Sequence, residues 1–158
     1  MSKSPITSPL PEADKKTTAA VLQATLVDLI DLSLVAKQAH WNVVGKNFRS
    51  VHLQLDELVS TAREYVDQVA ERANAIGVSP NGKAKTVVES SGIPDYPEGW
   101  RSDEQTVDAI VGILAALIQK LRKGIDETDK ADLVTQDLLI EITRALEEAH
   151  WMWQAQRA

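Results

Sequence analysis

The chain has 158 residues, of which 44% are hydrophobic and 25% charged, values typical of one ordinary globular domain. It contains no cysteine, which excludes disulfides, thiolate nucleophiles and cysteine-ligated zinc. A net charge of −6 argues against a surface that binds nucleic acid by bulk attraction and suits one that gathers cations.

Residues 1–14 are predicted to form a mobile N-terminal tail, because they are rich in Ser, Pro and Thr. The tail lacks the apolar segment of a signal peptide, and an apolar run such as residues 111–118 is too short to cross a membrane. We therefore expect a cytoplasmic protein. The positive charge of Lys3 in the tail is offset by the negative charges of Glu12 and Asp14. This balance favours a plain disordered terminus; an arm that binds DNA is the open alternative.

Residues 15–158 are predicted to form one all-α domain of four long helices, with no strand. Apolar residues recur at helical spacing from about Thr17 to Val43 and from about Phe48 to Ile76. Only the short segment around Gly45 separates these two helices, so they should be antiparallel neighbours. Two further helices, about Asp103 to Glu127 and about Leu133 to Gln156, are joined by a short acidic turn.

The connection between the second and third helices, residues 78–101, is long and rich in Pro and Gly, with a possible short helix at 83–90. Two short hairpins flanking one long crossover give the up-down-down-up order of a ferritin-like four-helix bundle. Each helix is predicted to bury a stripe of apolar side chains. In the first helix the stripe consists of Val21, Leu22, Leu26, Leu29, Ile30, Leu34 and Val35. In the fourth helix it consists of Leu138, Leu139, Ile142, Leu146 and Met152.

A stripe of metal-ligand side chains follows the second helix. His52 and Asp56 are one helical turn apart, as are Asp67 and Glu71, and the eleven residues from Asp56 to Asp67 are almost three turns. All four side chains therefore share one face. Imidazole and carboxylate together suit a divalent metal, with ferrous iron among the candidates.

The two pairs on this stripe cannot hold the same ion within one chain, because their centres are about 22 Å apart along the helix. Two copies of the helix packed antiparallel about a two-fold axis would bring each pair opposite its counterpart. The spacing therefore predicts an oligomer with two sites per dimer.

Residues 37–80, KQAHWNVVGKNFRSVHLQLDELVSTAREYVDQVAERANAIGVSP, closely resemble the Dps family, the small ferritin-like proteins of starved bacteria. The likeness lies in AHWNV at 39–43, Gly45, Phe48, the step from His52 to Asp56, and the step from Asp67 to AER at 70–72. Weaker similarity, including TDK at 128–130 and TQDLLI at 135–140, extends it over about residues 20–156.

The resemblance implies an iron site between two subunits, to which one chain gives His40, His52 and Asp56 and its partner gives Asp67 and Glu71. It also implies a hollow dodecamer that oxidises ferrous iron, preferably with hydrogen peroxide, and stores ferric oxide. Trp41, by the same resemblance, would lie beside the iron and accept stray oxidising equivalents; packing at an interface is an equally good role for it.

Acidic residues gather at the turn between the third and fourth helices, where they can cap a helix and complement its dipole. By resemblance, Asp129 and Asp137 would line a three-fold pore through which iron enters. His150 follows Glu147 by three residues on the fourth helix, but a metal site inside the bundle needs that step from two helices, so His150 is expected to be structural.

The leading functional prediction is a ferroxidase that also stores iron, whose removal of iron and peroxide would protect DNA from oxidation. The alternative is a nucleoid-packing protein that mainly binds DNA, since many weakly binding tails on one shell give avidity. A catalytically silent bundle is a third possibility, against which the ligand stripe argues.

Overall fold

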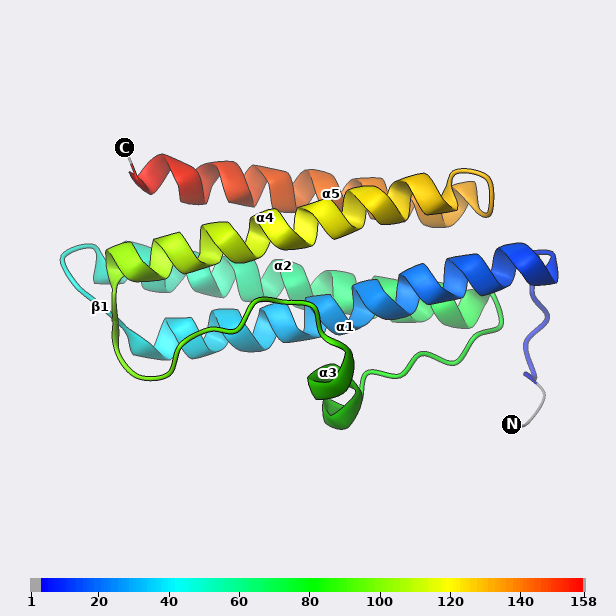
Figure 1. The fold of residues 1–158 in the computed structure, drawn as a ribbon, viewed down its shortest axis with the longest axis horizontal. Helices are drawn as coiled ribbons and strands as arrows, with labels where there is room; N and C mark the ends of the chain where they lie inside the picture. Colours follow the sequence, from blue (N-terminus) through cyan, green and yellow to red (C-terminus); the bar gives the residue numbers. More distant parts are fainter. Residues whose placement is uncertain (1–3, 158) are drawn as a thin grey trace.

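The computed structural model describes residues 4–157 and consists of helices joined by short loops and one long crossover (Figure 1). The helices are α1 (Glu12–Asn42), α2 (Phe48–Ala75), α3 (Ala84–Ser90), α4 (Asp103–Thr128), α5 (Leu133–Gln154) and the 3₁₀ helix η1 (Ala155–Arg157). The four long helices and the short one in the crossover confirm the predicted fold class.

The long helices run up, down, down and up, as predicted. In Figure 1, α1 and α2 form one antiparallel hairpin, α4 and α5 form the other, and the crossover carrying α3 passes over α1. The prediction that the chain has no strand is wrong: β1 (Val43–Val44) pairs in parallel with β2 (Arg101–Ser102). This bridge is only two residues long, too short to leave an alternating pattern in the sequence.

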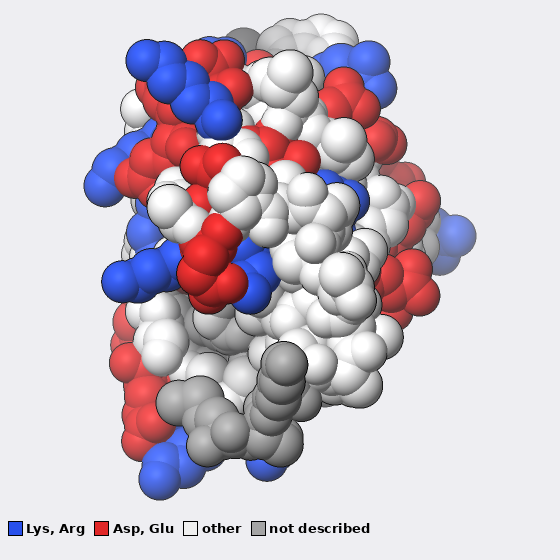
Figure 2. All heavy atoms as spheres, turned by 90° about the vertical axis from the view of Figure 1, so that its right-hand side faces the viewer, with Lys and Arg blue, Asp and Glu red and all other residues white. Residues whose placement is uncertain are grey.

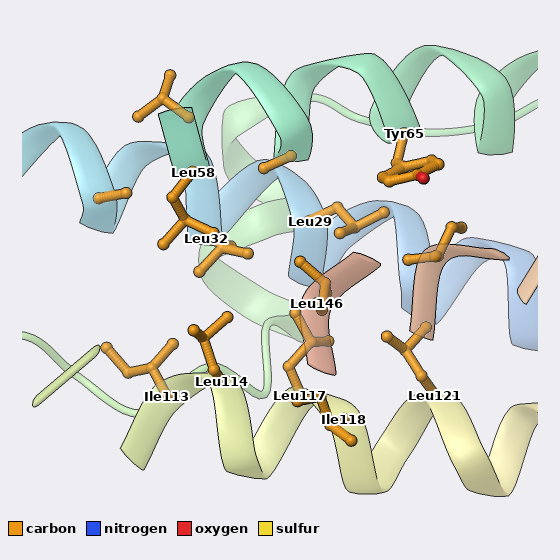
Figure 3. Packing of buried hydrophobic residues seen from close by; sticks show 14 of the residues in the cluster. Leu29, Leu32, Leu58, Tyr65, Ile113, Leu114, Leu117, Ile118, Leu121 and Leu146 are labelled. Carbon is orange, nitrogen blue, oxygen red and sulfur yellow. The ribbon is translucent and has the colours of Figure 1, made fainter. Parts of the chain in front are cut away.

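The core lies between the four long helices (Figure 3). Leu29 and Leu32 of α1, Leu58 of α2, and Leu114 and Leu146 from the second hairpin all point into it. The aliphatic side chains in this group have almost no solvent exposure, which is the burial expected to supply most of the stability of the fold. At the C-terminal end, Trp153 is completely buried.

Helix α1 has the length and composition of a membrane-crossing helix, with a mean hydropathy of 1.7 over its most apolar window. Its apolar side chains, however, form part of the bundle core: Leu22, Leu29 and Leu32 are fully buried against the other helices. The apolar character of α1 is thus accounted for by packing within the protein.

The crossover is fastened to α1 by two carboxylates. Buried Asp28 accepts the backbone N–H of Gly92 at 2.8 Å and pairs with Lys120 of α4 at 2.8 Å. One turn further, Asp31 accepts a hydrogen bond from the Ser91 hydroxyl. These contacts hold the segment after α3 across the outside of α1.

The N-terminal segment lies against the end of α2. Gly77 follows α2 with a φ of +78°, and a Cβ there would be 2.9 Å from the carbonyl oxygen of Ile6. Helix α1 begins at Glu12, directly after Pro11 and inside the predicted tail. Lys3 lies outside the described residues, and the mobility of the tail remains a prediction.

Candidate metal centre

The imidazoles of His40 and His52 are stacked, with their ring centroids 3.6 Å apart and their planes at 22°. His40 comes from the last turn of α1, where it is buried, and His52 from the second turn of α2. The Nδ1 of His40 is 2.8 Å from the backbone oxygen of His52, and the Nδ1 of His52 is 2.9 Å from the backbone oxygen of His40.

Because a carbonyl oxygen only accepts hydrogen bonds, each of these Nδ1 atoms is the donor. In the neutral ring the remaining nitrogen, Nε2, then carries the lone pair that binds metals. Hydrogen bonding of this kind to the other nitrogen is what orients histidine ligands in metalloproteins. Both rings of the pair therefore keep Nε2 as the nitrogen that can bind a metal.

Asp56 lies one turn beyond His52, and its Oδ1 is 3.3 Å from the Nδ1 of His40. The same carboxylate forms an ion pair with the ammonium group of Lys37, which lies one turn before His40 on α1. The hydrogen bond from Lys37 is the largest cause of the lowered pKa of Asp56; burial raises this pKa by less, and the charges of His40, Lys37 and His52 lower it further. Lys37 thus pairs with the carboxylate that the sequence predicts to bind a metal.

Asp67 and Glu71 lie on α2 with exposed side chains, about 22 Å along the helix from His52 and Asp56. Among residues 4–157, no group of three or more His, Cys, Asp or Glu side chains is arranged to hold a metal ion. The structure thus brings His40, His52 and Asp56 together and leaves Asp67 and Glu71 apart from them.

Aromatic side chains flank the histidines. Phe48, in the first turn of α2, lies against His52 with ring centroids 5.0 Å apart, and 43% of its surface remains exposed. Trp41 follows His40 directly and is 66% exposed, so its ring is not packed within this chain.

The acids of the α4–α5 turn divide into two kinds. Asp132 is buried, caps α5 by accepting the N–H of Val134, and pairs with Arg72 of α2 at 2.6 Å. Burial raises the pKa of Asp132, but hydrogen bonds from Thr135 and Arg72 outweigh it and leave the pKa below its ordinary value. Asp132 is therefore a structural carboxylate.

The two acids predicted to line a pore, Asp129 and Asp137, are both exposed at this turn. The Oδ1 of Asp129 accepts a hydrogen bond of 3.2 Å from Gln136. Figure 2 views this end of the bundle and shows acidic and basic side chains interspersed on it. The role of Asp129 and Asp137 in a pore remains a prediction.

The Glu147–His150 step on α5 does not form a metal site within the bundle. Glu147 is paired with Arg122 of α4, whose Nε is 2.7 Å from the carboxylate. The Nε2 of His150 is buried without a hydrogen-bond partner among the described residues.

Lys37 is the residue of the site that sequence reasoning missed, and Arg72 is the partner of Asp132 that it missed at the α4–α5 turn. Lys37 has a simple signal, since it precedes His40 by one turn and so lies on the same face of α1. Arg72 follows Glu71 directly, but its partner Asp132 is 60 residues away, which no local spacing reveals.

The chain is similar to a known protein family, to characterised proteins and to solved structures. The sequence profile of the family described as "Ferritin-like domain" matches residues 19–158. A DNA protection during starvation protein of Mycolicibacterium smegmatis is 37% identical over 145 residues, covering 90% of this chain and 79% of that protein. A fine tangled pili major subunit of Haemophilus ducreyi is 36% identical over 137 residues, covering 87% and 72%. The solved structure of Mycobacterium smegmatis Dps in a tetragonal form matches with a TM-score of 0.92 at 34% identity, covering 99% of this chain and 94% of that one.

Proposed function

The chain belongs to the Dps family of ferritin-like proteins, and from this premise we propose that it oxidises ferrous iron at sites shared by two subunits. In this proposal hydrogen peroxide is the oxidant, the ferric product is stored in the cavity of a dodecamer in the cytoplasm, and DNA is thereby protected. The observation that carries the proposal is the paired geometry of His40 and His52.

The stacked rings favour two metal ions over one. The ring centroids are 3.6 Å apart and both Nδ1 atoms are engaged, so each ring has only its Nε2 left for a metal. Two parallel imidazoles at this separation cannot both point their lone pairs at one ion, but each can bind one of two neighbouring ions. Ions in two-metal sites are about 3.5–4 Å apart, which this separation matches.

The remaining donors would come from the partner subunit. Asp67 and Glu71 are exposed, lie one turn apart and cannot reach His52 within their own helix. Antiparallel packing of two α2 helices about a two-fold axis would bring this pair against the histidines of the other chain. Carboxylate oxygen is a hard ligand and favours the ferric over the ferrous ion, so the acids would promote oxidation.

The proposed reaction balances as a two-electron step. Two ferrous ions each lose one electron, the O–O bond of one peroxide molecule breaks, and two protons complete two molecules of water. Because both electrons come from adjacent ions, no hydroxyl radical need be released. Trp41, exposed beside His40, would be an electron donor when only one ion is present.

A second candidate function is DNA packing, which the name of the Mycolicibacterium smegmatis relative makes worth testing. The net charge of −6 counts against it. Binding that weakens steeply from low to physiological salt would support contacts made by the lysines, whereas no binding at low salt would exclude this function.

The test of the proposal is anaerobic loading of the assembly with ferrous iron, followed by substoichiometric peroxide. We expect ferric absorbance to rise until two irons are oxidised per peroxide. His52→Ala should lose the fast phase, and zinc should inhibit it, since zinc ranks above ferrous iron in affinity and has no redox chemistry. Equal rates in His52→Ala and in the unaltered protein would refute the proposal.

A further inference from the structure

The two histidines come from different helices, so their relative position depends on the loop that joins α1 to α2. This loop, residues 43–47, contains β1 and Gly45 and ends at Asn47, the residue before α2. The loop lies against the start of α4, because Val43 and Val44 pair with Arg101 and Ser102. One side chain of α4, Asp103, contacts the loop at two further points.

Asp103 is more than nine-tenths buried, and its carboxylate accepts backbone N–H groups from two helix beginnings. Its Oδ2 accepts the N–H of Asn47 at 2.7 Å, and its Oδ1 accepts the N–H of Glu104 at 3.1 Å. The first N–H groups of a helix lack partners within the helix and carry partial positive charge, so one carboxylate stabilises the starts of both α2 and α4.

Gly45 allows this approach. A Cβ at position 45 would overlap the Asp103 carboxylate, with Oδ2 only 2.9 Å away, and the φ of +134° is one that side chains rarely adopt. The loop and the carboxylate thus fit each other only with glycine at 45.

The reciprocal histidine bonds are sensitive to the loop for a specific reason. The backbone oxygen of His40 is among the last four carbonyls of α1, which lack partners within the helix, and the His52 ring satisfies it at 2.9 Å. A shift of the start of α2 relative to the end of α1 would lengthen this bond and the opposite one at 2.8 Å together. The relative position of the two rings, and with it that of their Nε2 atoms, would then change.

We propose that Asp103 is a positioning residue of the metal centre: by holding the 43–47 loop on the start of α4, it fixes the register of His40 against His52. This inference rests on the proposed function. Asp103 itself binds no metal in it and acts only through the loop.

The test is a titration of the iron-free assembly with Co²⁺, read by its visible ligand-field spectrum, well below the unfolding temperature. In Asp103→Asn an NH₂ group, which cannot accept a hydrogen bond, replaces one carboxylate oxygen. One of the two hydrogen bonds from backbone N–H groups is therefore lost. We expect Co²⁺ affinity to fall about tenfold, as for other residues that orient metal ligands, with an altered spectrum.

Asp28→Asn is the matched control, because Asp28 is also buried and also accepts a backbone N–H, that of Gly92. It should lower the melting temperature as Asp103→Asn does, but leave the Co²⁺ affinity and spectrum unchanged. Light scattering confirms that each variant assembles.

Gly45→Ala provides an independent perturbation of the same contact. As a single substitution, Gly45→Ala should weaken Co²⁺ binding. The same substitution should have a smaller effect in an Asp103→Ala background, where the added methyl group no longer meets the carboxylate. If Asp103→Asn and Gly45→Ala bind Co²⁺ as the unaltered protein does, the inference is wrong and the proposed function stands. If the unaltered protein binds Co²⁺ no better than His52→Ala, both fail.

Discussion

His40 and His52 hold each other by exchanging hydrogen bonds, the ring of each donating to the backbone carbonyl of the other. Neither ring can turn without breaking one of these bonds, and the bond from the His52 ring also satisfies a terminal carbonyl of α1. The pair is therefore preorganised before any metal arrives, and the predictions below concern what completes it.

The shared site predicts recovery of activity on mixing two inactive variants. His52→Ala and Asp67→Ala should each disable every site in their own assemblies. A mixed dimer would have one site lacking both ligands and one intact site, so random pairing should restore roughly a quarter of the sites. The two variants are unfolded, mixed equally and refolded, and ferroxidation is measured. Verified mixed assemblies without recovery would contradict the shared site.

Removal of the Lys37 ammonium group should strengthen metal binding. Lys37 pairs with Asp56, so a metal that uses this carboxylate must first displace it. Lys37→Met keeps the length of the side chain without its charge. We expect Co²⁺ affinity to rise several-fold by titration, with Lys123→Met, on the exposed face of α4, as the control. Unchanged affinity would mean that Asp56 is not a ligand.

Asp132 should make stability depend on acid pH. Its pKa is lowered in the folded protein, so its contribution is present above the ordinary value of about 4 and is lost as pH falls through the lowered value. At neutral pH we expect Asp132→Asn to reduce the free energy of unfolding by about 1–3 kcal/mol. This difference, measured by denaturant unfolding, should shrink below about pH 4. A constant difference down to pH 2 would contradict the pairing with Arg72, and exposed Asp126→Asn serves as the control.

Asp137→Asn should slow iron uptake while leaving the interface sites intact. An exposed acid at a pore mouth attracts cations over a distance that salt screens, so the effect should diminish at high ionic strength. Stopped-flow ferroxidation at low and high salt measures this, with Glu98→Gln as a control at an exposed acid of the crossover. Equal slowing at both salt concentrations would exclude attraction at a pore.

The helices and their order could be predicted from the sequence because three of the four have a clear apolar stripe. Helix α1 is the exception: it is apolar on most sides, and the predicted core residue Leu34 is 54% exposed whereas Leu32 is fully buried. In α5, the apolar pattern predicts that Met152 is buried, but Met152 is 41% exposed and Trp153 is the buried residue. Trp153 follows Leu146 by seven residues and so lies on the same face of the helix.

The start of α1 differs from the boundary that composition predicts. The composition places Glu12 and Asp14 in the tail, yet acids after a proline are a signal for the first turn of a helix, and α1 begins at Glu12.

For the candidate site, spacing alone could place His52 with Asp56 and Asp67 with Glu71, since one turn of helix fixes such pairs. It could not reveal the reciprocal bonds of the histidines, the ion pair of Lys37 or the contact of Asp103 with the loop. Each of these joins segments whose relative position is set by packing of the whole bundle.

The division of the chain into two hairpins and one crossover also has a kinetic consequence. Within each hairpin, α1 with α2 and α4 with α5, contacts form across short loops and cost little chain entropy. The two hairpins meet only when the long crossover closes, so docking of preformed hairpins is the expected barrier to folding. The contacts of Asp28 and Asp31 that fasten the crossover would then form after this barrier. Weakening them should therefore speed unfolding while leaving the folding rate almost unchanged.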